Sequence, residues 1–245
     1  MNNEFLICGV HPLREAVLSG KSIEKVFLQK DIQNPQINDL KALIREKHIP
    51  MQFVPVEKLN RMTKTLHQGV IGLVSMISYV SLEDEMEKIL AQNDKPFLLM
   101  LDRVSDVRNM GAIVRTAECA GVQAVIIPDA GSAQINSDSV KTSAGALLRV
   151  PVCKVSNLKS AIHYLKACGL NVFAATEKGA ENYTQSDYTK PCVIIMGAEE
   201  DGVSKDLLKL SDELVRIPLQ GEIESLNVSV AAGVLLYEVV RQRNL

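Results

Sequence analysis

The sequence predicts an α/β fold: a mostly parallel sheet with helices on both faces, preceded by a smaller α/β domain. Apolar segments of strand length alternate with helical segments along the 245 residues. Some, such as CVIIMG at 192–197, are apolar at consecutive positions, which is typical of strands buried on both faces. An acidic segment at 81–96 interrupts the alternation. We therefore predict a small domain over 1–77, a linker helix over 78–95 and a larger domain over 96–245.

Elements of the small domain follow from periodicity and turn residues. Gly20 closes a first helix, Asn34-Pro35 opens a second one, and Pro50 ends it. The predicted helices span 12–20, 34–49 and 56–63, and the predicted strands span 23–29, 51–56 and 69–76. The acidic helix that follows is amphipathic, so we expect it to pack on one neighbour.

In the larger domain, runs rich in Val, Ile and Leu alternate with helical segments. The predicted strands span 97–104, 122–128, 148–155, 170–176, 192–197 and 213–219, and the predicted helices span 109–120, 138–147, 157–168, 203–210 and 227–242. Ligands of open α/β sheets bind beyond the carboxyl ends of the strands. We therefore expect the chemistry in the loops at 102–109, 175–182, 196–204 and 217–227.

Composition narrows the function classes. Hydrophobic residues make up 47% and charged residues 23% of the chain, as in ordinary soluble proteins. The five cysteines include no C-x-x-C pair, so neither disulfides nor a zinc site is indicated, and we predict no metal. The first residues show no signal peptide, and the apolar run of the last helix is too short to span a bilayer. We predict a cytoplasmic protein without a membrane partner.

The charge is unevenly distributed. The formal net charge is −2, yet residues 1–77 hold ten Lys and Arg against seven Asp and Glu. This bias is compatible with RNA binding and equally with an ordinary solvated surface. The four loops contain neither G-x-G-x-x-G nor G-x-x-x-x-G-K-[ST], and they contain no His. A dinucleotide oxidoreductase, a phosphate-cradling NTPase and a Ser-His-Asp hydrolase are therefore disfavoured.

The first informative stretch is DVRNMGAIVRTAECAG at 106–121. Asn109 is the expected N-cap of its helix. Its buried stripe is expected to consist of Met110, Ile113, Val114 and Ala117. Gly111 and Arg115 share another face, where something approaches the helix closely and the guanidinium could grip a phosphate. On the residues alone, a surface Arg115 paired with Glu118 is equally compatible.

A second stretch, MGAEEDGVS at 196–204, places Gly197 and Gly202 around three acids and ends in a helix cap at Ser204. Glycines permit a tight turn or a ligand lying against the backbone. Consecutive carboxylates disfavour phosphate and favour a cationic or neutral ligand. A solvated turn between a strand and a helix is the alternative.

The third stretch is the last helix, which opens with Ser225-Leu226-Asn227. One polar residue can cap the helix, and the other is then free to face a substrate at its positive end. The helix is apolar nearly all round, so we expect burial on more than one side, in part at a subunit interface. Its apolar residues include Val228, Val230, Ala231, Val234, Leu235, Val239 and Val240.

Together the three stretches resemble the SpoU-like branch of the SPOUT superfamily, the knotted RNA 2′-O-ribose methyltransferases. The resemblance rests on N-x-G-x-x-x-R-T-A at 109–117, G-A-E-x-x-G-x-S at 197–204, and Ile217-Pro218 followed by ESLNVSVA at 224–231. GVHPLREA at 9–16 is similar to the small RNA-binding domain of the rRNA-modifying members. Val107 and Glu200 depart from the family, which often has Pro and Gly at these two positions.

The resemblance implies S-adenosyl-L-methionine as cofactor, a C-terminal trefoil knot and a homodimer with its active site at the subunit interface. The implied cofactor-binding residues are Gly197, Ile217, Leu226, Thr176 and Met196. The implied catalytic residues are Arg115, Asn109, Glu199, Ser225 and Asn227. Candidate RNA contacts in the basic domain are His11, Arg14, Lys21 and Lys25.

Two classes of RNA substrate are compatible with the resemblance. The N-terminal domain favours a guanosine of large-subunit ribosomal RNA, with a tRNA ribose as the alternative. An alternative of another class is a non-catalytic RNA-binding ribosome-assembly factor that keeps the fold. The presence of all five implied catalytic residues argues against that alternative.

Overall fold

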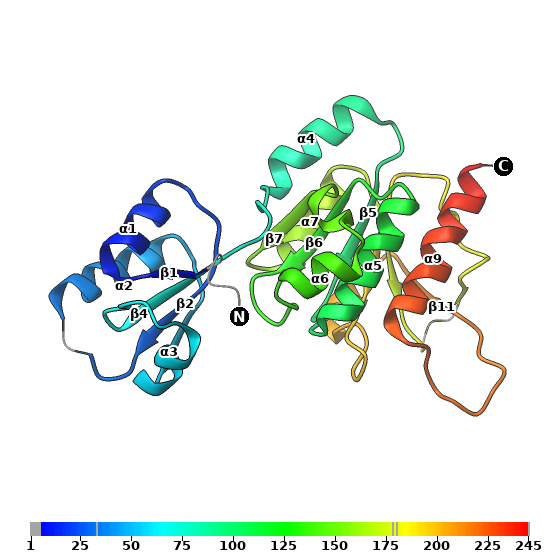
Figure 1. The fold of residues 1–245 in the computed structure, drawn as a ribbon. Coiled ribbons are helices and arrows are strands. Elements are labelled where there is room, and N and C mark those ends of the chain that lie inside the picture. Colours follow the sequence, from blue (N-terminus) through cyan, green and yellow to red (C-terminus); the bar gives the residue numbers. More distant parts are fainter. Residues whose placement is uncertain (1–5, 33, 178, 180, 245) are drawn as a thin grey trace. The chain divides into compact units, whose positions relative to one another are not determined.

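The structure is a computed structural model that describes residues 6–32, 34–177, 179 and 181–244. The chain divides into two units, Met1–Ser78 and Tyr79–Leu245, and each unit has its own sheet (Figure 1). The α/β fold class predicted from the sequence is confirmed.

The first unit is a four-stranded sheet in the order β1-β4-β2-β3, in which β2 and β3 are parallel and the other pairs antiparallel. Its elements are β1 (Leu6–Cys8), α1 (Val10–Leu18), β2 (Ile23–Gln29), α2 (Pro35–Glu46), β3 (Met51–Val54), α3 (Val56–Met62) and β4 (Val70–Val74). Helices α1 and α2 pack on one face around Val26 and Leu28, and α3 packs on the other around Phe27. Asn34 caps α2 through a hydrogen bond from the backbone nitrogen of Gln36.

The acidic segment forms α4 (Leu82–Gln92). Carboxylates in its first turn lie at the positive end of the helix dipole, where they stabilise it. The buried side chains of Leu82, Met86 and Ile89 belong to the hydrophobic core of the second unit. The helix therefore packs within that unit, and the chain divides just before it.

The second unit holds a seven-stranded sheet in the order β7-β6-β5-β10-β8-β11-β9, and all of its strand pairs are parallel. The strands are β5 (Phe97–Leu101), β6 (Ala124–Pro128), β7 (Val152–Val155), β8 (Asn171–Ala175), β9 (Glu181–Asn182), β10 (Cys192–Met196) and β11 (Glu213–Arg216). Central strands β5 and β10 are buried at every residue, as their apolar runs predict. The two-residue β9 was not predicted, because Glu and Asn carry no apolar pattern.

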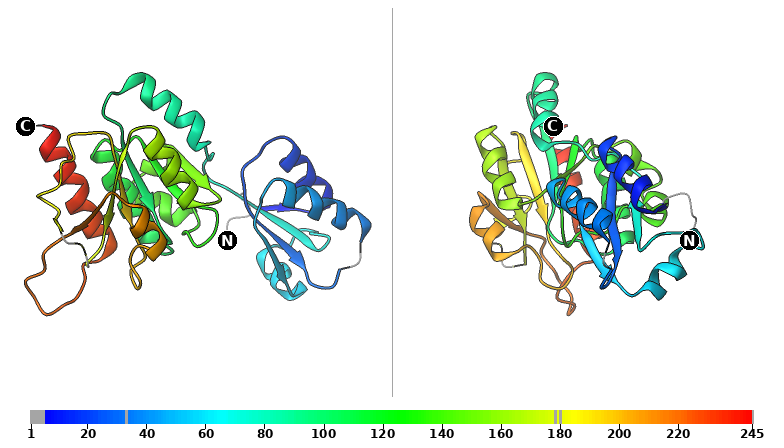
Figure 2. Two further views of the ribbon diagram at one scale, coloured as in Figure 1. Left: turned by 180° about the vertical axis from the view of Figure 1, so that it is seen from behind. Right: turned by 90° about the vertical axis from the view of Figure 1, so that its left-hand side faces the viewer.

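Helices cover both faces of this sheet (Figure 2). They are α5 (Val107–Cys119), α6 (Ser137–Thr142), the 3-10 helix η2 (Ala146–Leu148), α7 (Leu158–Ala167), α8 (Lys205–Leu210) and α9 (Val228–Arg243). One core contains the apolar side chains of α4, α7 and α8. On the opposite face, α5 lies against α6 and α9. The predicted trefoil knot stays a prediction.

Predicted boundaries of α5 and α6 were wrong. The N-cap of α5 is Asp106, not Asn109, since the Asp106 carboxylate accepts hydrogen bonds from the backbone nitrogens of residues 108 and 109. The helix predicted over 138–147 ends at Thr142. Ala144 and Gly145 both have positive φ, at 50° and 86°, which an α-helix cannot accommodate.

In a single chain, α9 is buried on one side only. Leu235, Leu236 and Val239 are fully buried, whereas Val230 is 52% and Tyr237 is 51% exposed. The described residues of this chain therefore do not supply the burial on a second side that we predicted.

The close approach predicted at Gly111 is made by the same chain. The buried stripe of α5 is confirmed, and Gly111 is buried as well. A Cβ atom on Gly111 would lie 2.7 Å from both the carbonyl oxygen of Ser139 and Cβ of Thr142. The glycine therefore allows α6 to pack on α5. Gly111 is buried beneath α6, whereas Arg115, one turn later, is exposed.

Gly111→Ala is expected to lower the stability of the second unit by about 1–2 kcal/mol, because overpacking outweighs the gain of about 1 kcal/mol in helix propensity. Gly233→Ala on α9 is the matched control, since among the described residues outside its own helix backbone its Cβ would meet only Thr116 Cγ2, at 3.7 Å. That variant is expected to be neutral or stabilised in thermal unfolding. Equal stabilisation of both variants would contradict the packing role of Gly111.

Candidate active site

A cavity of about 870 Å³ lies at the carboxyl ends of β8, β10 and β11. Its lining includes all five residues predicted to bind a cofactor: Thr176, Met196, Gly197, Ile217 and Leu226. Apolar side chains from the strands share its walls with the carboxylates of 199–201. Its volume suits a ligand of cofactor size, for which pockets of roughly 300–1,000 Å³ are usual.

The loop from Gly197 to Ser204 forms one wall of this cavity and closes on itself. Ala198 and Gly202 exchange two backbone hydrogen bonds of 3.1 and 2.9 Å. A Cβ on Gly197 would lie 2.0 Å from the carbonyl carbon of Gly202 and 2.1 Å from the nitrogen of Val203. Glycine at 197 is therefore required for the turn itself, and Gly202 has the positive φ of 64° that favours glycine.

Asp102 and Arg103 support this loop. They lie in the loop at 102–109, where we expected chemistry, but neither was among the predicted site residues. Asp102 is 4% exposed, and its carboxylate accepts hydrogen bonds from the backbone nitrogen of Ser204 at 2.7 Å and from Arg103 Nε at 3.1 Å. That hydrogen bond raises the pKa of Arg103, so the guanidinium stays charged. The signal available in the sequence was a carboxylate directly after the fully apolar strand FLLML.

Three of the predicted catalytic residues meet through their side chains. Asn227 Nδ2 donates to Glu199 Oε1 at 2.7 Å and to Asn109 Oδ1 at 3.1 Å. Asn227 Oδ1 in turn accepts from the backbone nitrogen of Ser229 and thereby caps α9. Ser225 lines the large cavity nearby. The motifs at 109, 199 and 227 therefore form one polar cluster, which we name the Asn227 cluster (Asn109, Glu199, Asn227).

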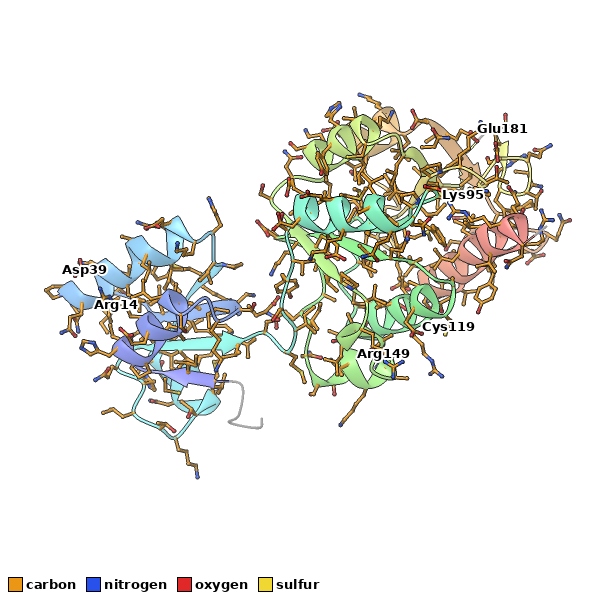
Figure 3. All side chains as sticks on the ribbon, turned by 90° about the horizontal axis from the view of Figure 1, so that it is seen from above. Arg14, Asp39, Lys95, Cys119, Arg149 and Glu181 are labelled. Carbon is orange, nitrogen blue, oxygen red and sulfur yellow. The ribbon has the colours of Figure 1, made fainter. Side chains whose placement is uncertain are left out.

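Arg115 stands apart from the Asn227 cluster. It is exposed on α5, and it lines neither the large cavity nor the smaller one described next. Within the described residues, Arg115 makes no hydrogen bond or ion pair, and Glu118 pairs with Arg149 instead at 3.8 Å. Figure 3 shows Arg149 near Cys119, at the end of α5. The predicted alternative of an Arg115–Glu118 pair is therefore wrong.

A smaller cavity of about 170 Å³ adjoins the large one. The two share Arg103 and residues 198–201, and the smaller cavity adds Ser105, Asp106 and Asn109 from the start of α5. Its lining is mostly polar and rich in hydrogen-bond acceptors. Glu199 lines both spaces, so the Asn227 cluster lies between them.

The four candidate RNA contacts of the first unit do not form one patch. His11 and Arg14 lie on α1, which covers one face of the sheet. Lys25 alternates with Val26 on β2 and therefore faces the side of α3. Lys21 is exposed in the turn between α1 and β2.

The described residues offer neither a metal site nor a membrane-spanning helix. Across residues 6–32, 34–177, 179 and 181–244, no group of three or more His, Cys, Asp or Glu side chains could hold a metal ion. In the same part of the chain, no helix has the length and apolar character needed to cross a membrane.

Comparison with known proteins decides the family. The pattern of the SpoU rRNA Methylase family matches residues 96–237, and that of the RNA 2′-O ribose methyltransferase substrate binding domain matches residues 6–80. The chain belongs to the SpoU methylase family. A putative TrmH family tRNA/rRNA methyltransferase of Staphylococcus haemolyticus is 36% identical over 244 residues, which cover 98% of this chain and 97% of that relative.

Solved structures of SpoU-type enzymes share this fold. The SpoU methyltransferase AviRb of Streptomyces viridochromogenes is 25% identical with a TM-score of 0.63, covering 98% of this chain and 90% of that one. An AdoMet-bound rRNA methyltransferase of Sinorhizobium meliloti is 27% identical with a TM-score of 0.61, covering 97% and 87%. S-adenosyl-L-methionine is the cofactor of the family, so the predicted family and cofactor are confirmed.

Val107 and Glu200, the two residues that depart from the SpoU pattern, have defined positions in the structure. Val107 is the first residue of α5, where Pro is favoured because its nitrogen needs no partner. Val107 holds this position with Asp106 as the cap, so the helix start does not depend on Pro. Glu200 is exposed and lines both cavities, where it adds a carboxylate.

Proposed function

We propose that this chain transfers a methyl group from S-adenosyl-L-methionine to a ribose 2′-hydroxyl of RNA, and that the acceptor is a guanosine of large-subunit ribosomal RNA. One observation carries the proposal: the Asn227 cluster lies between a cavity of cofactor size and a smaller polar cavity. Such a junction can hold two reactants next to each other, which supplies much of the rate in a group transfer.

The large cavity fits the cofactor. When bound, S-adenosylmethionine supplies an electrophilic methyl group on a positively charged sulfur. The carboxylates of Glu199, Glu200 and Asp201 favour a cation in this space. The backbone at Gly197, Ile217 and Leu226 offers hydrogen bonds to a nucleoside, and Thr176 and Met196 complete the proposed binding residues.

The smaller cavity is assigned to the acceptor ribose. Asn109 and Glu199 line it, and Asn227 orients both of them through its amide. Amide and carboxylate groups suit ribose hydroxyls, which both donate and accept. Ser225, at the positive end of α9, is proposed to hold the ribose or the cofactor loop.

Arg115 is assigned to the RNA. A guanidinium stays protonated in proteins, so Arg115 is a poor general base. It is suited to gripping the neighbouring phosphate and to stabilising negative charge that develops on the ribose oxygen. Because Arg115 lines neither cavity of its own chain, we propose that it completes the site of a second copy in a homodimer. The exposed Val230 and Tyr237 of α9 support such an interface.

RNA is proposed to bind first through the N-terminal unit, with His11, Arg14, Lys21 and Lys25 as candidate contacts. Sequence-specific RNA recognition uses loops and splayed nucleotides, which also expose a 2′-hydroxyl. A tRNA ribose is the second candidate, since the relatives are described as tRNA/rRNA methyltransferases. The cytoplasm is the proposed location.

The test uses the purified full-length chain. At about 100 times its Kd, S-adenosylmethionine is expected to stabilise the protein by ~2.7 kcal/mol in thermal unfolding, and NAD is expected to have no effect. Labelled methyl groups should then enter unmodified transcripts of ribosomal RNA and not those of tRNA. Stabilisation without transfer to either RNA would favour the non-catalytic assembly factor. Transfer to tRNA alone would favour the second candidate.

A further inference from the structure

We propose that Asp102 and Arg103 form a latch that holds the loop 197–204 in its ligand-ready conformation before any ligand binds. Arg103 is thereby a positioning residue for methyl transfer. The expected effect of Arg103 on S-adenosylmethionine binding rests on the proposed function. It concerns residues at the end of β5 that lie outside the three stretches from which the site was predicted.

The contacts of Arg103 reach two adjacent residues in the second half of the loop. Its Nη2 donates to the carbonyl oxygen of Gly202 at 3.1 Å, and its Nη1 lies 3.5 Å from the Asp201 carboxylate. Asp102 holds Ser204, two residues after Gly202, by accepting a 2.7 Å hydrogen bond from its backbone nitrogen. Two adjacent side chains thus hold the stretch from 201 to 204, about a hundred residues further along the chain.

The latch is itself held rigidly. Asp102 accepts from Arg103 Nε and Nη2 at 3.1 and 3.3 Å, a two-point pairing that fixes the plane of the guanidinium. The backbone nitrogen of Asp102 donates to the carbonyl oxygen of Met196, just before the loop begins. Arg103 also has a backbone φ of 60°, a left-handed conformation that residues other than glycine rarely adopt. Strained residues of this kind concentrate at functional sites.

Charge explains why the loop needs a latch. Glu199, Glu200 and Asp201 are consecutive carboxylates that repel one another when the loop folds. Among the described residues, the one ion pair made by any of these three acids is that of Asp201 with Arg103. Without Arg103, the repulsion would be unbalanced and the buried Asp102 would lose its cationic partner. The loop would then open.

An open loop would disturb both halves of the proposed site. The latched residues line the large cavity, and Arg103 and Asp201 also line the smaller one. Glu199 reaches Asn227 from the same loop. The buried Asp102, directly after β5, therefore helps to position the residues around both the cofactor and the acceptor.

The experiment compares Arg103→Met, Arg103→Lys and the unaltered protein, with Lys88→Met as control. Lys88 forms a comparable ion pair with Glu85 at 3.1 Å on α4 and lines neither cavity. Hydrogen exchange of the cofactor-free proteins is measured for peptides covering 197–204 and, as reference, 158–167. Arg103→Met is expected to speed exchange of the loop by roughly tenfold and to leave the reference helix unchanged. Arg103→Lys should restore part of the protection, because it keeps the charge and loses the two-point pairing.

Cofactor affinity provides a second readout. Arg103→Met is expected to raise the Kd for S-adenosylmethionine by roughly tenfold in calorimetry, and to raise KM for the cofactor more than it lowers kcat. Unchanged loop exchange in Arg103→Met, or a similar change in Lys88→Met, would overturn the latch. If the unaltered protein does not bind S-adenosylmethionine, the proposed function fails, while loop exchange still decides the latch.

Discussion

Replacing Arg115 by alanine is expected to lower the rate of methyl transfer by roughly 10²–10³-fold, the usual cost of removing one stabilising donor from a transition state. Affinity for S-adenosylmethionine should not change, because Arg115 lines neither cavity of its own chain. Arg115→Lys keeps the charge and loses the planar fork, so it should retain part of the activity. The measurements are single-turnover transfer to ribosomal RNA and calorimetry with the cofactor. A large loss of cofactor affinity in Arg115→Ala would contradict the assigned role.

Mixed dimers test whether Arg115 acts on the partner's site. Arg115→Ala and Gly197→Ala chains are each expected to be inactive, and they are unfolded together and refolded at equal amounts. Half of the dimers then contain one chain of each kind, and each of these has one complete site if Arg115 acts across the interface. About a quarter of the activity of the unaltered protein should return. If the mixture stays inactive although mixed dimers are present, Arg115 acts within its own chain.

Gly197→Ala is expected to have the second large effect, a loss of cofactor affinity and of activity by about 10²-fold or more. The added Cβ would lie 2.0 Å from the backbone of Gly202, so the whole loop must move. A misplacement of about 1 Å at a site can cost about 10²-fold in rate. Calorimetry with S-adenosylmethionine measures the loss of affinity.

Gly221→Ala is the matched control for that variant. Gly221 lies in the neighbouring loop between β11 and α9, and apart from its own chain neighbours no atom of the described residues lies within 4 Å of its ideal Cβ. The control should bind the cofactor like the unaltered protein and have the same thermal midpoint. Full cofactor affinity in Gly197→Ala would show that the loop conformation described here is not the one that binds.

Much of the second unit was predictable because its central strands are buried on both faces. The apolar runs at β5 and β10 identify strands without ambiguity, and the polar residues that follow them mark the edge where a ligand binds. The same reasoning missed β9, whose two polar residues pair with the sheet only through their backbone. The hydrophobic pattern of a segment gives no information about backbone pairing of this kind.

The candidate site was less predictable than the fold. Asp106 and Asn109 are both good helix caps, and only the structure shows that Asp106 is the cap while Asn109 bonds to Asn227. The role of Gly111 depends on α6, which no spacing within α5 can reveal. Arg103 reaches Gly202, 99 positions away in sequence, so the latch arises only when two distant loops meet.

The acceptor that we propose for the methyl group is a ribose 2′-hydroxyl of RNA. The most direct measurement incubates unmodified ribosomal RNA transcripts with the protein and isotopically labelled S-adenosylmethionine, digests the RNA to nucleosides and identifies the labelled product by mass spectrometry. Labelled 2′-O-methylguanosine that disappears with Arg115→Ala is the predicted result. Label on a nucleobase would rule out ribose methylation. The absence of any labelled nucleoside, under conditions in which the protein binds both the RNA and the cofactor, would rule it out as well.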